Sequence, residues 1–166
     1  FPAGLEDAVH VYKCLLNQGY EPGNIVIVGD SAGGGLTLAT QLVLREMKLP
    51  LPAASVCLSP WVDLAFTGKS VQDFQTEDPI VKVDEVRIWA DLYAGDYPLQ
   101  HPLISPLYAD LSGLPPILIQ ASETEVLTSD AKRLAKRITK AGGTVQLQTW
   151  PDLLHVWQLF WRILPE

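Results

Sequence analysis

The sequence predicts an α/β fold with a parallel sheet of about four strands and flanking helices. Short apolar segments rich in β-branched residues alternate with longer segments whose apolar residues recur every three or four positions. A long, proline-rich stretch over residues 59–116 interrupts this alternation, whereas the other connections are short. Strands that alternate with helices form parallel sheets through right-handed crossovers, so one such sheet is expected here.

The first half of the chain predicts two helices and two strands. Residues 3–18 place apolar side chains on one helical face, and Gly19 ends that helix. Residues 25–28 are continuously apolar and β-branched, which predicts a central strand buried on both faces. Residues 31–47 form the next helix, entered through glycines, and residues 54–58 form a second apolar strand.

The second half begins with the proline-rich stretch, which we interpret as a lid-like insertion over a site at the carboxyl ends of the strands. The fourth strand alternates apolar and polar residues, which favours a place near the sheet edge. The expected elements are a helix over residues 83–94, a strand over 117–120, a helix over 129–141, a strand over 144–150 and a helical segment over 155–164.

Composition excludes several classes of function. The 166 residues are 48% hydrophobic with a net charge of −7, which predicts one domain over residues 1–166 without the basic face of a nucleic-acid binder. No apolar run approaches the roughly 20 residues of a membrane span, and no signal peptide is visible, so a cytoplasmic location is expected. Cys14 and Cys57 are predicted to be buried free thiols, with no spacing that suggests a disulfide framework or a metal site.

The glycine-rich turn after the first strand carries the clearest chemical signal. Gly29, Ser31 and Gly33 form a G-x-S-x-G pattern between a predicted strand and a predicted helix. Such a turn holds the serine in a strained conformation with Oγ projecting from the sheet. Side chains at Gly29 and Gly33 are expected to collide with neighbouring backbone. The Ala32 N–H would then face a developing oxyanion.

The same turn has two other interpretations. A phosphate cradle is disfavoured, because no Lys-Ser/Thr follows the glycines and the G-x-G-x-x-G spacing is absent. A glycine-rich helix start without any function is the remaining alternative, which the strand-turn-helix context disfavours.

A serine nucleophile requires a base, and the chain has three histidines. His10 is expected on the surface of the first helix and His101 in a solvated loop. His155 follows the fourth strand and is therefore expected at the carboxyl ends of the strands, where the serine turn also lies. The loop after the third strand offers Glu123 and Glu125 as the orienting carboxylate, which completes the chain order serine, acid, histidine.

Several motifs together resemble the bacterial hormone-sensitive-lipase family of esterases. The resemblance runs over nearly the whole chain. Its motifs are Gly-Asp-Ser-Ala-Gly-Gly-Gly at residues 29–35, Leu-Ser-Pro-Trp-Val-Asp-Leu at 58–64, His-Pro-Leu-Ile-Ser-Pro-Leu at 101–107, Leu-Pro-Pro at 114–116 and His-Val-Trp-Gln-Leu-Phe at 155–160.

This resemblance implies a partial α/β-hydrolase that cleaves short-to-medium acyl esters without a cofactor. Ser31 matches the nucleophile, His155 the base and Ala32 one oxyanion N–H donor. Glu125 matches the family acid, since an apolar pair and an Asp-containing helix start follow it, and Glu123 is the alternative. The candidates for substrate contact are Asp30, Trp61, Val156 and Trp157, with core packing as the alternative for the two tryptophans.

One family feature is not found. The family carries a His-Gly-Gly-Gly oxyanion loop upstream of the serine turn, which this chain lacks. The loss of one oxyanion donor typically lowers turnover by about 10²–10³-fold. The strand at residues 25–28 would also lack a neighbour, and an unpaired edge favours self-association.

Two hypotheses follow. The first is a serine carboxylesterase that works through a Ser-His-Glu triad and an acyl-enzyme; an amide or lactone substrate would use the same triad. The second is a catalytically weak or inactive hydrolase remnant that self-associates as a homo-oligomer.

Overall fold

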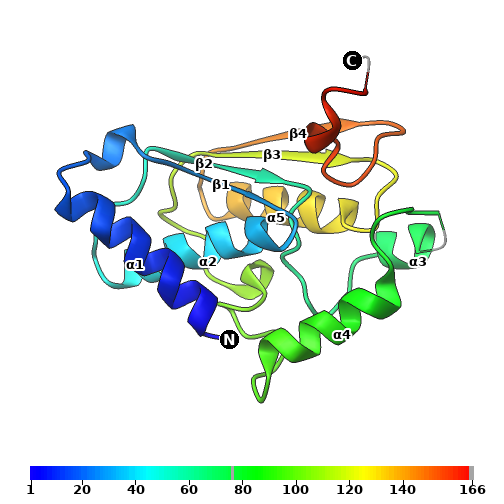
Figure 1. Ribbon diagram of the computed structural model, residues 1–166, viewed down its shortest axis with the longest axis horizontal. Coiled ribbons are helices and arrows are strands. Elements are labelled where there is room, and N and C mark those ends of the chain that lie inside the picture. Colours follow the sequence, from blue (N-terminus) through cyan, green and yellow to red (C-terminus); the bar gives the residue numbers. More distant parts are fainter. Residues whose placement is uncertain (76, 165–166) are drawn as a thin grey trace.

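A parallel, four-stranded sheet in the order β1-β2-β3-β4 forms the centre of the computed structural model, which describes residues 1–75 and 77–164 (Figure 1). The strands are β1 (Val26–Asp30), β2 (Ala54–Leu58), β3 (Ile117–Ser122) and β4 (Val145–Trp150). All three pairings are parallel, and β4 lies at an edge. The predicted fold class is confirmed, because each strand overlaps the segment that its apolar pattern indicated.

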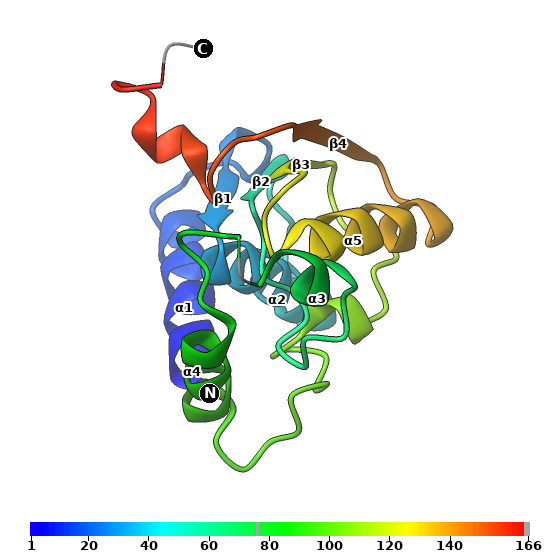
Figure 2. The ribbon, with the colours of Figure 1, turned by 90° about the vertical axis from the view of Figure 1, so that its right-hand side faces the viewer.

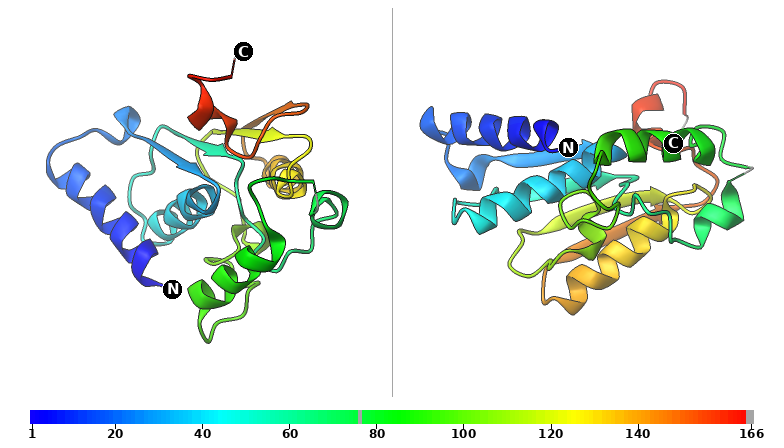
Figure 3. Two further views of the ribbon diagram at one scale, coloured as in Figure 1. Left: turned by 45° about the vertical axis from the view of Figure 1, so that its right-hand side comes forward. Right: turned by 90° about the horizontal axis from the view of Figure 1, so that it is seen from below.

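One helix precedes the first strand, and the others connect successive strands. The predicted helices correspond to α1 (Ala3–Asn17), α2 (Ala32–Glu46), α4 (Val83–Ala94) and α5 (Thr128–Lys140); α3 (Ser70–Phe74) is a short helix that the sequence pattern did not indicate. Helices α2 and α5 lie against one face of the sheet, and the C-terminal segment lies on the opposite side (Figures 1 and 2). Figure 3 shows α3 and α4 near the carboxyl ends of the strands, where a site is expected.

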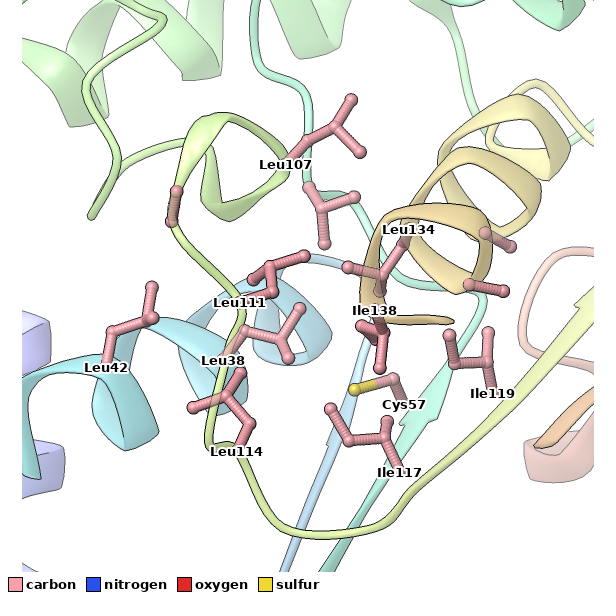
Figure 4. Packing of buried hydrophobic residues seen from close by; sticks show 14 of the residues in the cluster. Leu38, Leu42, Cys57, Leu107, Leu111, Leu114, Ile117, Ile119, Leu134 and Ile138 are labelled. Atoms are coloured by element: carbon pink, nitrogen blue, oxygen red, sulfur yellow. The ribbon is translucent and has the colours of Figure 1, made fainter. Parts of the chain in front are cut away.

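The main core lies between the sheet and helices α2 and α5 (Figure 4). Ile117 and Ile119 of β3 point into it, opposite Leu38 of α2 and Leu134 and Ile138 of α5, and all five are almost completely buried. Each buried residue of this size stabilises the fold by about 1.5–3 kcal/mol. This packing fixes the sheet against the two helices that begin next to the candidate site.

Strand β1 corrects one expectation. The apolar run predicts a central strand buried on both faces, whereas the family resemblance implies that this strand lacks one neighbour. Among the described strands β1 pairs only with β2, in agreement with the second expectation, but it is not buried on both faces. Val26 and Val28 are 50% and 59% exposed on the face that α2 does not cover. A run of four apolar residues indicates that a strand can be buried on both faces. Whether it is buried depends on which other elements pack against each face.

The C-terminal segment also differs from its prediction. Residues 155–164 were expected to be helical, but only the 3₁₀ helix η3 (Trp157–Phe160) forms there. Val156 adopts a left-handed conformation with φ of 52°, and its N–H donates to Ser59 Oγ instead of to a helical carbonyl. Because a left-handed residue does not continue a right-handed helix, no longer helix begins at His155.

The cysteines are free thiols, as predicted, but only Cys57 is fully buried, whereas Cys14 is half-buried on α1. Burial raises the pKa of the Cys57 thiol to about 12, so this side chain stays protonated and packs as an apolar group. None of the described helices combines the length and the apolar character that crossing a bilayer requires.

Candidate active site

The serine turn is strained and held on both sides. Ser31 lies between β1 and α2 with φ of 51° and ψ of −118°, a conformation that costs a non-glycine residue about 1–3 kcal/mol. Its N–H donates to Leu58 O over 2.8 Å, and its carbonyl accepts from Trp61 N–H over 2.9 Å. The last residue of β2 and the segment that follows this strand therefore hold both backbone groups of Ser31 in place.

The glycines of the turn allow close backbone approach. A Cβ atom at Gly29 would collide with the Gly33 carbonyl, and Cβ atoms at Gly34 and Gly35 would collide with Pro60 and Trp61. The expected collision at Gly33 is wrong, because a Cβ atom there would meet only Asp30 Oδ1, at 4.0 Å. The first turn of α2 directs that position away from the strand, and the close contact falls one and two residues later.

A buried carboxylate–imidazole pair lies at the carboxyl ends of β3 and β4. Glu125 Oε2 is 2.7 Å from His155 Nδ1, and Glu125 Oε1 accepts the Ser122 N–H over 3.0 Å. Both side chains are buried, at 2% and 6% exposure. Glu123 is exposed and accepts a hydrogen bond from Thr149 Oγ1 instead. Of the two glutamates, Glu125 is therefore the one that contacts His155.

The loop that carries His155 returns across the sheet toward the serine turn. Val156 N–H donates to Ser59 Oγ over 3.1 Å, and Ser59 directly follows β2. Ser59 N–H in turn donates to Gln120 O over 2.7 Å, and its side chain is completely buried. Among the described residues, no hydrogen bond joins Ser31 Oγ to His155. The turn and the imidazole loop meet instead through the shared segment that begins at Ser59.

The other two histidines lie elsewhere. His10 is exposed on α1 beside Cys14, with its Nε2 atom 3.4 Å from Sγ. His101 is half-buried, accepts the Leu103 N–H on Nδ1 and lies with its ring 5.4 Å from that of Phe1. His101 therefore packs against Phe1, whereas a position in a solvated loop was expected.

An apolar cavity of about 290 Å³ adjoins the serine turn. Ala32, Gly33 and Trp61 line it from the turn side, and Trp89 and Tyr93 line it from α4. The two aromatic residues of α4 were not foreseen, because nothing in the local pattern of the insertion indicates which helix face meets the turn.

The four candidates for substrate contact occupy different surroundings. Trp61 is buried and borders the apolar cavity, whereas Asp30, Val156 and Trp157 are not among the described residues that line it. Asp30 is exposed at the end of β1, and Val156 is buried. The Trp157 ring lies 5.0 Å from the ring of Trp150 on β4.

The segment after β2 is also tied to α5 through buried charges. Asp130 Oδ2 accepts the N–H groups of Val62 and Asp63, and burial raises the pKa of Asp130 to about 7. Burial opposes ionisation of Asp63 as well, but hydrogen bonds from a threonine hydroxyl, the Arg133 guanidinium and a tyrosine hydroxyl lower its pKa. The Asp63–Arg133 ion pair, 2.8 Å long, anchors this segment beside the site.

A parallel sheet whose strand leads through a strained serine into a helix, combined with a buried carboxylate–imidazole pair, is the arrangement of the α/β hydrolases. Residues 1–159 match the sequence profile of a family described as having the alpha/beta hydrolase fold. The chain belongs to this family.

Among its relatives are proteins named as an acetyl-hydrolase and an esterase. The chain is 45% identical to an acetyl-hydrolase of Streptomyces hygroscopicus over 166 residues, which cover all of this chain and 56% of the relative. It is 32% identical to an esterase of Acinetobacter venetianus over 172 residues, which cover all of this chain and 55% of the relative. The chain thus spans about half the length of the curated relatives it matches.

The solved structures agree with this assignment. An esterase of the bacterial hormone-sensitive lipase family superposes with a TM-score of 0.97 at 50% identity, over 99% of this chain and 56% of that chain. EstE5, which was soaked with p-nitrophenyl butyrate, superposes with a TM-score of 0.96 at 39% identity, over 99% of this chain and 55% of that chain. The resemblance drawn from the sequence motifs is confirmed.

Proposed function

We propose that this chain carries the serine-nucleophile half of a carboxylesterase and acts through Ser31, His155 and Glu125. The observation that carries the proposal is the contact of 2.7 Å between Glu125 Oε2 and His155 Nδ1. The loop of His155 is hydrogen-bonded to Ser59, in the segment that also holds the backbone of Ser31. The names of the relatives support ester hydrolysis as the reaction.

In the proposed mechanism, His155 Nε2 accepts the Ser31 proton while Oγ attacks the ester carbonyl. Glu125 accepts the Nδ1–H hydrogen bond, which selects the imidazole tautomer and stabilises the imidazolium. The imidazolium then protonates the leaving alcohol and leaves an acyl-enzyme on Ser31. Water, deprotonated by His155, attacks this ester, and the acid product departs as Oγ regains its proton.

Ala32 supports the oxyanion in this proposal. It is the first residue of α2, where backbone N–H groups have no carbonyl partner within the helix. The positive end of the helix dipole adds favourable potential for developing negative charge.

The apolar cavity supports a short-to-medium acyl group as the part of the ester that the site binds. Its lining by Ala32, Trp61 and the aromatic residues of α4 is suited to a hydrocarbon chain and offers little to a charged group. Among the four candidates for substrate contact, Trp61 is the one we retain for the acyl chain, while Asp30, Val156 and Trp157 stay candidates for substrate contact elsewhere in the site. We further propose one domain over residues 1–166, with residues 59–116 as the lid-like insertion.

Fluorophosphonate labelling tests this function without dependence on turnover. We expect stoichiometric modification of the chain, with the adduct on the peptide that contains Ser31, and faster hydrolysis of p-nitrophenyl butyrate than of p-nitrophenyl palmitate. The reason is that a cavity of about 290 Å³ accommodates the shorter chain better. Absence of any adduct, measured by mass spectrometry, would contradict the proposal.

The edge of β1 favours a second candidate function, self-association of this chain. Val26 and Val28 are exposed on a strand whose outer edge has no partner among the described strands. We expect a dimer or larger species at micromolar concentration by light scattering, and dissociation when Val28 is replaced by lysine. A monomeric mass for the unmodified chain would refute self-association. A cytoplasmic location and the absence of a nucleic-acid partner stay predictions of the sequence.

A further inference from the structure

Hydrogen bonds from the insertion reach the loop of the proposed acid at Val126, which directly follows Glu125. Val126 N–H donates to Asp78 Oδ2 over 3.0 Å, and Val126 O accepts from Ser70 Oγ over 2.5 Å. Val126 is completely buried. Two side chains of the insertion therefore hold both backbone groups of the residue next to the acid.

The Asp78 side chain is also held by hydrogen bonds within the insertion. Its Oδ1 atom accepts the N–H groups of Ile80 and Val81, each over 2.9 Å, and the residue is 2% exposed. Hydrogen bonds to an ionised carboxylate are about twice as strong as neutral ones. One carboxylate thus joins a turn of the insertion to the loop of the proposed acid.

Asp78 also lies beside the carboxylate–imidazole pair. Asp78, Glu125, Asp152 and His155 line one cavity of about 290 Å³, on the polar side of the site. Glu125 Oε1 already bonds the Ser122 N–H, so the side chain spans a fixed backbone donor and the imidazole. A shift of the backbone at Val126 would change how Glu125 reaches both partners.

We propose that Asp78 is a positioning residue for the Glu125–His155 pair. Its carboxylate fixes the backbone at Val126 and thereby sets the distance between Glu125 Oε2 and His155 Nδ1. The insertion then does more than cover the site, because it determines whether the acid meets the imidazole. The catalytic consequence rests on the proposed esterase function, whereas the effect on the hydrogen bond does not.

Asp78→Asn tests the hydrogen bond to Val126 without changing the size of the side chain. The amide has the same size, and its oxygen can still accept the Ile80 and Val81 N–H groups. Its NH₂ group then faces the Val126 N–H, so two donors oppose each other at the acid loop. A displacement on the order of 1 Å at an active site lowers turnover by about 100-fold. We expect a loss of roughly that size in kcat for p-nitrophenyl butyrate, with little change in KM.

The spectroscopic signature is the proton on His155 Nδ1, observed by NMR. In the unmodified chain this buried proton, bonded to Glu125, is expected to exchange slowly with water. In Asp78→Asn we expect exchange at least about tenfold faster, because local opening frees the ring N–H. This readout requires no turnover. If the unmodified chain shows the proton but takes no fluorophosphonate label, the esterase function fails and the positioning role is still tested.

Asp73→Asn is the control within the insertion. It also replaces a carboxylate of the insertion by an amide, but the Asp73 carboxylate pairs with Lys69 Nζ in an exposed contact on α3 and not with the acid loop. We expect this variant to keep the Nδ1 proton and the kcat of the unmodified chain. Equal changes in both variants, or an unchanged proton and kcat in Asp78→Asn, would overturn the proposal.

If Asp78→Asn does not fold, Ser70→Ala tests the same contact with the backbone of Val126. It removes the two hydrogen bonds of the Ser70 hydroxyl, the one donated to Val126 O and the one accepted from Ser129 N–H, and leaves the Asp78 carboxylate in place. A smaller change in the same direction, in both kcat and proton exchange, is expected. A folded Ser70→Ala variant with unchanged proton exchange would then overturn the proposal.

Discussion

Ser31→Ala is expected to abolish hydrolysis of p-nitrophenyl butyrate, with a loss in kcat of about 10⁶-fold for an enzyme of this mechanism. Alanine keeps the Cβ atom, so the strained turn and its hydrogen bonds to Leu58 and Trp61 should persist. Only the hydroxyl that attacks the ester is removed. Initial rates and fluorophosphonate labelling measure the effect, and thermal unfolding verifies that the fold is retained.

Ser112→Ala serves as the control for this prediction. The Ser112 hydroxyl bonds only the Asp110 carboxylate in an exposed turn, so the rate of this variant should match that of the unmodified chain. Equal rates for Ser31→Ala and the unmodified chain would exclude Ser31 as the nucleophile.

Glu125→Gln is expected to lower kcat by about 10⁴-fold, the effect seen when the acid of such a triad becomes an amide. Glu125 accepts two hydrogen bonds, one on each oxygen, from Ser122 N–H and from His155 Nδ1–H. Glutamine has a single acceptor oxygen, so one of these donors must face an NH₂ group. If the imidazole turns to the other tautomer to avoid this clash, Nε2 carries the proton and no longer acts as a base.

Glu123→Gln is the matched control. Glu123 is exposed, and its hydrogen bond is to Thr149 Oγ1, which a glutamine oxygen can also accept. We expect steady-state rates to stay within about twofold of the unmodified chain, as for surface substitutions away from a site. The opposite pattern, a large loss in Glu123→Gln and none in Glu125→Gln, would reassign the acid.

Local patterns predicted most of the fold. The segments at residues 54–58 and 83–94 match β2 and α4 in both bounds, because apolar runs and helical periodicity express short-range backbone and burial preferences. The serine turn was equally local, since its geometry depends on a strand, two small residues and a helix start within a few positions.

The errors fall where distant elements decide the outcome. The exposure of one face of β1 depends on which elements pack against it, and the shortness of η3 depends on a hydrogen bond from Val156 to Ser59, 97 residues away. The absence of a collision at Gly33 depends on the direction of the first turn of α2. None of these is encoded in the periodicity of the segment concerned.

The sequence by itself determined the fold class, the strained turn at Ser31 and the order serine, acid, histidine along the chain. The family resemblance already favoured Glu125 over Glu123, but only the tertiary structure shows Glu125 in contact with His155, and only it revealed Asp78 beside the acid loop. The two candidate acids are two positions apart on one loop, and their partner is 30 residues beyond Glu125. Which carboxylate reaches the imidazole is decided by how the crossing α5 and β4 return the chain to the sheet edge.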